Sequence, residues 1–499
     1  MEKESGFNIL FIYPNVNTHY SFSPAIEILS SYLKMFGYQT DLIHINDKFS
    51  IPLDKNTIQT LVIDKNPDLI CFTSTTYDYN EANKIAGWIN ELDLNRLIIL
   101  GGIHSTIKPN DVDSSNFDAF CIGEGEKPLL NLIKKLINGD NIFKTKSFWF
   151  KGKERNEIEP YLKDLSELPY HDFDIIDTKK LLKERNGWLS LSFSRGCPYK
   201  CSFCINPLLR KINNADKTYL RKRTVKDSIE ELEYLSIKYK GLIKVFNLDD
   251  DLLMIFKDWI LDFCKQYKKK IYEKYDIKFS TNCRVDLLDD DIAKKLSESG
   301  CFELKIGVET ANNKLRNGLL HKNISKKQIA KAFSICRKNN IQSIGYFMLG
   351  LPGENEDTIL ETIDLVNMVK PDLMRTTFLH PYFGSEIYEY CDERKLFKDK
   401  EYIDTFTESP LIIKGISEKD LLKYKFMFPW YVNSKIIGLG DTYNEAISKF
   451  DHMDYEELLN NHDSILDIDS TLSENLNNLG ISHFKYFNKN KYYYQYKRL

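Results

Sequence analysis

Short apolar runs alternate with helical patterns along the first 140 residues. The apolar runs predict strands at Phe7–Tyr13, Thr40–Ile45, Asp68–Ser74, Leu97–Gly101 and Phe117–Ile122. Helical periodicity lies between them, as in Ala25–Met35, Tyr79–Leu92 and Lys127–Leu136. Because continuously apolar strands are buried on both faces, this alternation predicts a parallel, doubly wound α/β sheet. Ligands of such sheets bind beyond the carboxyl ends of the strands.

A second series of strands and helices follows. Its strands are predicted at Trp188–Ser194, Ile243–Leu248, Ile277–Thr281, Leu304–Val308, Ser343–Leu349 and Met374–Leu379. Its helices include Val225–Tyr239, Asp291–Ser299, Lys326–Asn339, Glu356–Val369 and Glu386–Lys395. Six strand–helix repeats predict a partial (β/α)6 barrel of the TIM type, in which the chemistry lies on the loops after the strands.

These patterns divide the chain into four predicted regions. They are a Rossmann-like domain at 1–140, an irregular charged linker at 141–186, the partial barrel at 187–395, and a smaller domain at 396–499 that could face the substrate. From Phe484 onward, aromatic and basic residues interleave. This pattern is typical of a nucleic-acid patch, or of a C-terminal strand that packs its aromatics on a core. We favour the strand because the charge bias is local.

Composition and charge exclude several functions. The net charge of −3 over 499 residues gives no general attraction to nucleic acid or membranes. No apolar run reaches the roughly 18 residues of a membrane span. The stretch Met1–Phe7 lacks a signal-peptide pattern. Most cysteines lie in apolar contexts, as expected for reduced thiols of a cytoplasmic protein.

The most specific motif is Cys-x3-Cys-x2-Cys, formed by Cys197, Cys201 and Cys204 directly after the first barrel strand. Three thiolates can bind three irons of a [4Fe-4S] cluster and leave the fourth iron open for chemistry. The alternatives are three core cysteines on one helix face, or a zinc site. Gly196 and Pro198 favour a loop over a helix. Zinc would require a fourth ligand, and no second Cys or Cys/His pair follows.

Polar residues follow each of the other barrel strands. These stations are Asp249–Asp251, Asn282–Asp286, Glu309–Thr310, Gly350–Glu354 and His380–Gly384. Taken singly, each of these polar segments is weak evidence for a functional site. The aspartates could cap a helix, Arg284 could pair with Asp286 on the surface, and Gly350 could belong to an ordinary turn. Their occurrence in order, at the same rim of a barrel, predicts a shared site.

With these motifs, residues 187–385 resemble the radical S-adenosylmethionine (SAM) superfamily. The similar segments are the cysteine motif, Thr281–Leu288, Ile306–Thr310, Phe347–Glu354 and His380–Gly384. The resemblance implies that SAM chelates the open iron and that its one-electron reduction yields methionine and a 5′-deoxyadenosyl radical. It also implies a small-molecule substrate and an electron donor such as flavodoxin or ferredoxin. The charge pattern leads us to expect no nucleic-acid partner.

The resemblance further implies roles for individual residues. The three cysteines would bind the cluster. The SAM contacts would be an aromatic ring at adenine, an acidic residue at the ammonium group, groups at the ribose and carboxylate, and a glycine at close approach: Phe203, Asp249 or Asp250, Glu309, Arg284 and Gly350. The sequence names no catalytic side chain beyond these.

Residues 7–137 resemble the cobalamin (B12)-binding domain of one branch of that superfamily. The similar segments are Leu100–Ser105 and Ile122–Glu126, and the resemblance implies cobalamin contacts at Ser74, Gly101 and Gly102. The Asp-x-His-x-x-Gly motif, whose histidine would bind cobalt, is absent. We therefore expect cobalamin to be bound without an axial histidine, or to have been lost. His104 is better interpreted as a structural residue.

The expected function is cobalamin-dependent methylation of an unactivated carbon in a small-molecule or natural-product pathway. A radical cyclisation, rearrangement or oxidation would use the same residues. RNA methylthiolation is disfavoured because the N-terminal domain offers only Cys71 and Cys121 for a further cluster. A non-catalytic iron–sulfur or corrinoid-binding protein would not need the polar stations of the barrel.

Overall fold

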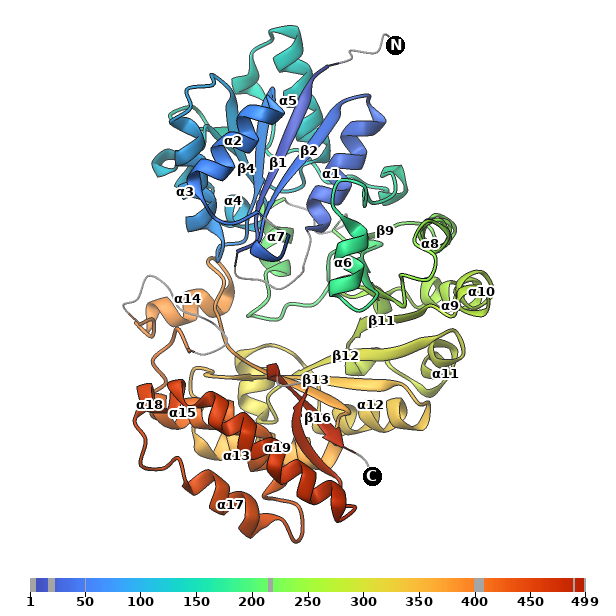
Figure 1. Cartoon of the computed structure of the whole chain (residues 1–499), viewed down its shortest axis with the longest axis vertical. Helices are drawn as coiled ribbons and strands as arrows, with labels where there is room; N and C mark the ends of the chain where they lie inside the picture. Colours follow the sequence, from blue (N-terminus) through green and yellow to red (C-terminus); the bar gives the residue numbers. More distant parts are fainter. Residues whose placement is uncertain are drawn as a thin grey trace. The chain divides into compact units, whose positions relative to one another are not determined.

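The computed structural model describes residues 6–16, 23–49, 51–213, 219–398, 408–487 and 490–497, and many of its helices and strands are labelled in Figure 1. The chain forms two compact units. The first comprises Met1–Cys197 and Leu208–Asn247, and the second comprises Pro198–Pro207 and Leu248–Leu499. The domain boundaries at 140, 186 and 395 stay predictions.

The N-terminal sheet of the first unit is doubly wound, as predicted. Its strands are β1 (Asn8–Pro14), β2 (Gln39–Ile45), β3 (Leu69–Thr73), β4 (Leu97–Gly101), β5 (Ala119–Cys121) and β6 (Phe148–Phe150), in the order β2-β1-β3-β4-β5-β6. The first five strands run parallel, and β6 pairs antiparallel with β5. The sheet therefore extends by one strand into the segment that the sequence pattern presents as an irregular linker.

Alternate side chains of these strands enter two different cores. Helices α1 (Pro24–Met35) and α5 (Glu126–Asn138) cover one face, where Phe11 and Cys71 are buried. Helices α2 (Lys55–Lys65) and α3 (Tyr79–Asn90) cover the other face. A short helix, α4 (Ile103–Ile107), follows β4. Because both faces are covered, the strands are apolar throughout, which is the pattern seen in the sequence.

The rest of the first unit begins the barrel. Helix α6 (Thr178–Glu184) precedes β7 (Trp188–Leu191), and α8 (Val225–Lys238) precedes β10 (Val245–Leu248), the neighbour of β7. The predicted strand Trp188–Ser194 is interrupted after Leu191. Residues Ser194–Arg195 instead form β8, which pairs antiparallel with β9 (Arg221–Lys222). This small ribbon leads the chain into the cysteine loop.

The second unit carries the other four predicted barrel strands. They are β11 (Lys278–Cys283), β12 (Cys301–Glu309), β13 (Gln342–Leu349) and β14 (Leu373–Phe378), paired in parallel in this order. Helix α9 (Lys257–Tyr267) precedes these strands, α11 (Asp290–Glu298), α12 (Lys326–Lys338) and α13 (Glu356–Val369) lie between them, and α14 (Glu386–Glu393) follows the last. Capping boxes at Ser325 and Asn355 start α12 and α13. The partial β/α barrel is confirmed.

The C-terminal part of the second unit is mainly helical. Its elements are α15 (Glu418–Phe426), α16 (Phe428–Asn433), α17 (Gly440–Ser448), α18 (Tyr455–Asn460), α19 (His462–Asn478), β15 (His483–Phe487) and β16 (Asn490–Lys497). Strand β16 pairs antiparallel with β14, and Phe484 and Tyr486 are buried. The predicted C-terminal strand is therefore confirmed. Within the ranges described, no helix combines the length and apolarity needed to cross a bilayer.

Candidate functional site

The cysteine segment folds as a loop, so the alternative of three core cysteines on one helix face is wrong. No residue from Cys197 to Cys204 is helical. In the first unit, Gly196 has φ of +93°, and a Cβ there would come within 2.4 Å of the Tyr219 carbonyl oxygen. Only glycine fits this approach, so the position that precedes Cys197 is fixed by the backbone.

In the second unit, Ser202 anchors the remainder of the loop. Its N–H donates to the Leu320 carbonyl at 3.2 Å and its hydroxyl donates to the Leu319 carbonyl at 2.6 Å. Its own carbonyl accepts the N–H of Ile387 at 3.1 Å. Three hydrogen bonds on one residue hold the loop between Cys201 and Cys204.

Polar donors point at the sulfur atoms of Cys201 and Cys204. The Arg284 Nη1 lies 4.0 Å from the Cys201 Sγ, and the Asn206 Nδ2 lies 3.7 Å from the Cys204 Sγ. Burial raises the pKa of both thiols, while Lys322 and Arg284 oppose the shift at Cys201. Buried thiols of this kind become thiolates when a metal compensates the charge.

Among the described residues, no three Cys, His, Asp or Glu side chains are grouped as ligands of a single metal ion. An iron–sulfur cluster distributes its thiolates over several irons, so its ligands are more widely spaced than those of one ion. The donor set and the loop are therefore compatible with a cluster, and the zinc alternative gains no support.

Arg284 holds several parts of the second unit around Cys201. Its Cζ lies 3.7 Å from the centre of the Tyr199 ring, and its Nε lies 2.8 Å from the Asp286 Oδ1. Its Nη2 donates to the carbonyl of Lys322. The pair with Asp286 was one sequence alternative, but the arginine is only 6% exposed rather than on the surface. These contacts tie the residue that follows β11 to Tyr199 and Cys201 of the loop and to the backbone at Lys322.

Glu309 and Lys322 form a buried ion pair at the end of β12, with 2.5 Å between Oε1 and Nζ. Glu309 has φ of +70°, in the left-handed region that disfavours side chains. A Cβ on Gly307 would come within 2.6 Å of the Lys322 Nζ. The Lys322 Nζ also lies 5.8 Å from the centre of the Phe203 ring. The sequence interpretation did not include Lys322, which stands alone in a loop.

The three aspartates after β10 have different environments. Asp250 is 1% exposed, and its carbonyl accepts the Asn282 side chain at 2.7 Å. Asp251 accepts the Asn206 side chain at 3.0 Å, whereas Asp249 is exposed and lies 3.5 Å from the Lys305 Nζ. None of them caps a helix, since the N-cap of α9 is Phe256. That alternative for the aspartates is wrong.

Gly350 follows β13 with φ of +73°. Its N–H donates to the Glu354 Oε2 at 2.5 Å, and the N–H of Leu351 reaches the same oxygen at 3.2 Å. Burial raises the pKa of Glu354 to about 8, despite these two bonds. The glycine loop is thus shaped by a carboxyl group four residues away, a contact that the spacing Gly350–Glu354 could have suggested.

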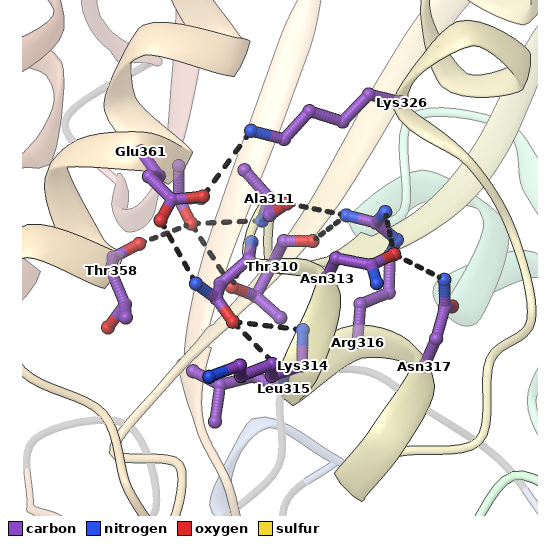
Figure 2. A network of polar contacts seen from close by, with 12 residues as sticks. Thr310, Ala311, Asn313, Lys314, Leu315, Arg316, Asn317, Lys326, Thr358 and Glu361 are labelled. Atoms are coloured by element: carbon purple, nitrogen blue, oxygen red, sulfur yellow. Dashed lines mark hydrogen bonds and ion pairs between the residues drawn. The ribbon is translucent and has the colours of Figure 1, made fainter.

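The segment between β12 and α12 is held by the network in Figure 2. Arg316, only 1% exposed, donates to the carbonyls of Ile324, Thr310 and Ala311 at 2.9, 3.0 and 2.6 Å. Asn312 donates to Glu361 of α13 at 3.0 Å. This segment carries the carbonyls that anchor Ser202, so its rigidity supports the cysteine loop.

The first unit contains a cavity of about 280 Å³ at the carboxyl ends of β1, β3, β4 and β5. Apolar side chains of α1 and α5, together with Phe148, form much of its wall, and Cys71 and Cys121 also line it. The backbone of Gly101 and Gly102 lines the same cavity, whereas Ser74 does not. The position agrees with the rule that parallel sheets bind ligands at the carboxyl ends of their strands.

Gly102 fits closely against the loop after β3. With φ of +99°, a Cβ there would lie 2.7 Å from the Ser74 carbonyl oxygen and 2.8 Å from the Thr73 Oγ1. The buried Ser74 hydroxyl has no hydrogen-bond partner among the described residues. An unsatisfied buried hydroxyl beside a glycine cradle is the kind of feature that a polar ligand group can complete.

His104 has the structural role expected of it. Its ring is 2% exposed and stacks on Tyr79, with 3.6 Å between the ring centres. Burial lowers its pKa to about 3, so the imidazole is neutral. Its Nε2 lies 3.3 Å from the Asp111 Oδ2.

The comparisons with known families agree with the two resemblances. The family model described as the radical SAM superfamily matches residues 191–366, and the model described as the B12 binding domain matches residues 19–133. The chain thus carries a radical SAM domain together with an N-terminal B12-binding domain.

Relatives match most of the chain at low identity. An uncharacterized methyltransferase of Pyrococcus horikoshii is 26% identical over 418 residues, covering 82% of this chain and 88% of that protein. An anaerobic magnesium-protoporphyrin IX monomethyl ester cyclase of Rubrivivax gelatinosus is 25% identical, covering 79% and 72%. The solved radical SAM methyltransferase TsrM of Kitasatospora setae, with cobalamin and a [4Fe-4S] cluster bound, has a TM-score of 0.65 at 16% identity, covering 81% and 79%. The last likeness concerns the fold.

Proposed function

We propose that this chain is a cobalamin-dependent radical SAM methyltransferase that acts on an unactivated carbon of a small molecule. One combination of features carries the proposal. A Cys-x3-Cys-x2-Cys loop with donors aimed at its sulfurs lies in the radical SAM domain, and a largely apolar cavity lies in the B12-binding domain. The names of two relatives, both methyltransferases, support the same reaction class.

In this proposal Cys197, Cys201 and Cys204 bind the [4Fe-4S] cluster. Arg284 and Asn206 donate toward two of the sulfurs, and such hydrogen bonds stabilise thiolate ligands. The assignment of all three cysteines to one cluster rests on their spacing in the sequence.

The SAM assignments divide into two kinds. Phe203, Asp250 and Gly350 can act through an aromatic face, a buried carboxylate and a close backbone approach, and Asp249 is an exposed alternative to Asp250. Glu309 and Arg284 are already engaged, with Lys322 and Asp286 respectively. We propose that these two form the charged wall of the SAM site, with Lys322 as a third member that balances Glu309.

Cobalamin is assigned to the cavity of the first unit. Gly101 and Gly102 supply a wall without side chains, and the Ser74 hydroxyl supplies a buried polar group beside it. His104 is neutral and stacked on Tyr79, which supports binding without an axial histidine. When bound, the cofactors supply a 5′-deoxyadenosyl radical and a methyl group, while the protein holds the substrate and excludes water.

A second candidate is a radical cyclase that uses the same cofactors without methyl transfer. The cyclase of Rubrivivax gelatinosus covers most of this chain at an identity similar to that of the archaeal methyltransferase. The residues described above serve either reaction, so the products must separate the two.

The test is anaerobic reconstitution with iron, sulfide and cobalamin, followed by reduction in the presence of SAM and candidate substrates. A reductant such as flavodoxin or ferredoxin supplies the electrons. The proposal predicts 5′-deoxyadenosine together with S-adenosylhomocysteine. 5′-Deoxyadenosine alone would favour the cyclase, and neither product with a substrate-containing extract would contradict radical chemistry.

A further inference from the structure

We infer that Glu124, Glu126, Arg195 and Arg221 form a positioning cluster that couples cobalamin binding to retention of the iron–sulfur cluster. All four residues belong to the first unit. The inference rests on the proposed function, because it needs both cofactors. It assigns a role to the segment Ile122–Glu126, which the sequence comparison left without one.

The positioning cluster of four side chains contains two arginines that face each other across the small ribbon. Arg195 of β8 and Arg221 of β9 are paired directly, so their like charges would repel. Glu124 lies between them, 3.1 Å from the Arg195 Nη1 and 2.7 Å from the Arg221 Nη2. Glu126 lies 2.5 Å from the Arg195 Nη2. Two carboxylates thus balance two guanidinium groups.

The surroundings make these ion pairs strong. Arg221 is buried, donates to the Leu162 carbonyl at 2.9 Å, and lies 4.4 Å from the centre of the Tyr161 ring. Burial opposes ionisation of Glu124, yet Arg195 and Arg221 keep its pKa below the ordinary value. Removing one member of a buried charge pair leaves its partner uncompensated, which is costly. The four side chains therefore form one ion-pair network.

One end of this ion-pair network, at Arg195, leads to the cysteine loop. Arg195 is separated from Cys197 only by Gly196, whose backbone is packed against the carbonyl of Tyr219 on the way into β9. A residue that fits this tightly cannot absorb a displacement. The position of Arg195 is therefore transmitted to Cys197 through two rigid peptide units.

The other end of the ion-pair network borders the cavity. Gly123, Glu124 and Gly125 of the loop between β5 and α5 line it, together with Glu126 at the start of α5 and Arg195 of β8. A ligand in the cavity favours one position of this loop, and an iron–sulfur cluster on Cys197 favours one position of the ribbon that the loop holds. Because the ion pairs join the two positions, each occupant should favour binding of the other.

The experiment compares cobalamin affinity in protein with and without a reconstituted cluster, by anaerobic equilibrium dialysis of hydroxocobalamin. In the wild type we expect affinity to rise at least about fivefold when the cluster is present. The reciprocal measurement is the iron retained at equilibrium against a chelator, with and without cobalamin. Neither measurement depends on turnover.

Two variants and one control make the test specific. Glu126→Gln removes one of the two carboxylate charges that balance Arg195, so the ratio of the two affinities should fall toward one. Arg195→Lys keeps the charge but loses the two-carboxylate fork, so an intermediate ratio is expected and guards against a Glu126→Gln protein that fails to fold. Glu157→Gln removes an exposed partner of Lys146 and should leave the ratio unchanged.

The outcomes separate the two levels of the argument. A wild type that binds both cofactors with no change in affinity overturns the coupling while leaving the proposed function intact. So does a Glu126→Gln protein that keeps the wild-type ratio. A wild type that binds no cobalamin or no cluster overturns the proposed function, and the coupling with it.

Discussion

The two candidate cofactor regions are built in opposite ways. In the first unit the cavity is walled mainly by apolar side chains and by glycine backbone, and its charged lining residues, Glu124, Glu126 and Arg195, are paired with one another. In the second unit the residues near Cys201 are charged and already paired, as in Arg284 with Asp286 and Lys322 with Glu309. One region is shaped by volume, and the other by charge balance.

The difference follows from what each region would hold. A bulky organic ring gains most from burial of apolar surface, at about 25 cal/mol per Å². Thiolates and a carboxylate ligand concentrate negative charge, so they need fixed positive groups that are compensated before binding. Substitutions at the apolar and glycine wall of the cavity should therefore act by steric exclusion, and those near Cys201 by electrostatics.

The largest expected effect is at the cysteine loop. Cys201→Ala should abolish cluster binding and SAM cleavage, because a cluster held by two thiolates is not retained. Iron and sulfide analysis and EPR of the reduced protein measure this loss. Cys391→Ala, which removes a buried thiol of α14, is the matched control and should keep the cluster. Full cluster occupancy in the Cys201→Ala protein would contradict the assignment.

Next in size is the steric test in the first unit. Gly102→Ala places a methyl group 2.7 Å from the Ser74 carbonyl oxygen, and should lower cobalamin affinity about tenfold or more, equivalent to about 1.4 kcal/mol. Gly139→Ala is the control, because Gly139 also has positive φ but nothing lies within 4 Å of a Cβ there. Both variants should lose about 1–3 kcal/mol of stability to backbone strain. Equal affinities in the two variants would show that the cavity wall is not involved.

A smaller effect is expected from the charge around Cys201. Arg284→Lys keeps the positive charge but loses the donor to the sulfur, so the reduced cluster is less stabilised. We expect the reduction potential to fall by about 60 mV, which is about 1.4 kcal/mol for one electron. EPR-monitored redox titration measures it. Arg337→Lys, whose arginine donates to the Val369 carbonyl, should leave the potential unchanged. An unaltered potential in Arg284→Lys would remove the electrostatic half of the comparison.

The last effect concerns pH and is measured on the stability of the fold, not on cofactor binding. Burial raises the pKa of Glu354 from 4.5 to about 8, so the folded protein holds a proton that the unfolded chain has lost. Between these values the stability contributed by the protonated carboxyl declines as pH rises, by at most about 1.4 kcal/mol per unit. Urea unfolding at several pH values should show this decline in the wild type but not in Glu354→Gln. The exposed Glu273→Gln variant should follow the wild type. Parallel curves for wild type and Glu354→Gln would contradict the raised pKa.

Much of the fold could be predicted because its signal is local. Strand β4 and helix α13 have the predicted bounds, Leu97–Gly101 and Glu356–Val369, since apolar periodicity and capping residues define both. The turn from β7 into the ribbon could not be predicted, because its pairing partner β9 lies more than 20 residues further along the chain. Strand β6 could not be predicted for a different reason, because three residues show too little periodicity.

The same difference between local and distant contacts applies to the candidate site. The cysteine spacing and the polar stations are written in short segments, so the sequence could indicate them. The pairs Glu124 with Arg221 and Arg284 with the Lys322 carbonyl join residues 97 and 38 positions apart, and no short segment encodes them. Lys322 could not be predicted as a site residue, because only the folded structure places it beside the carboxylate of Glu309.

The buried guanidinium of Arg316 has a consequence for how this chain can vary. Its side chain binds three carbonyls of one segment, those of Thr310, Ala311 and Ile324, and Asn317 also binds the last of them. Such an arrangement lets neighbouring positions accept many residue types, because their backbone is held from elsewhere. It also makes Arg316 sensitive to substitution, since its loss would remove three hydrogen bonds from the segment whose Leu319 and Leu320 carbonyls anchor Ser202 in the cysteine loop.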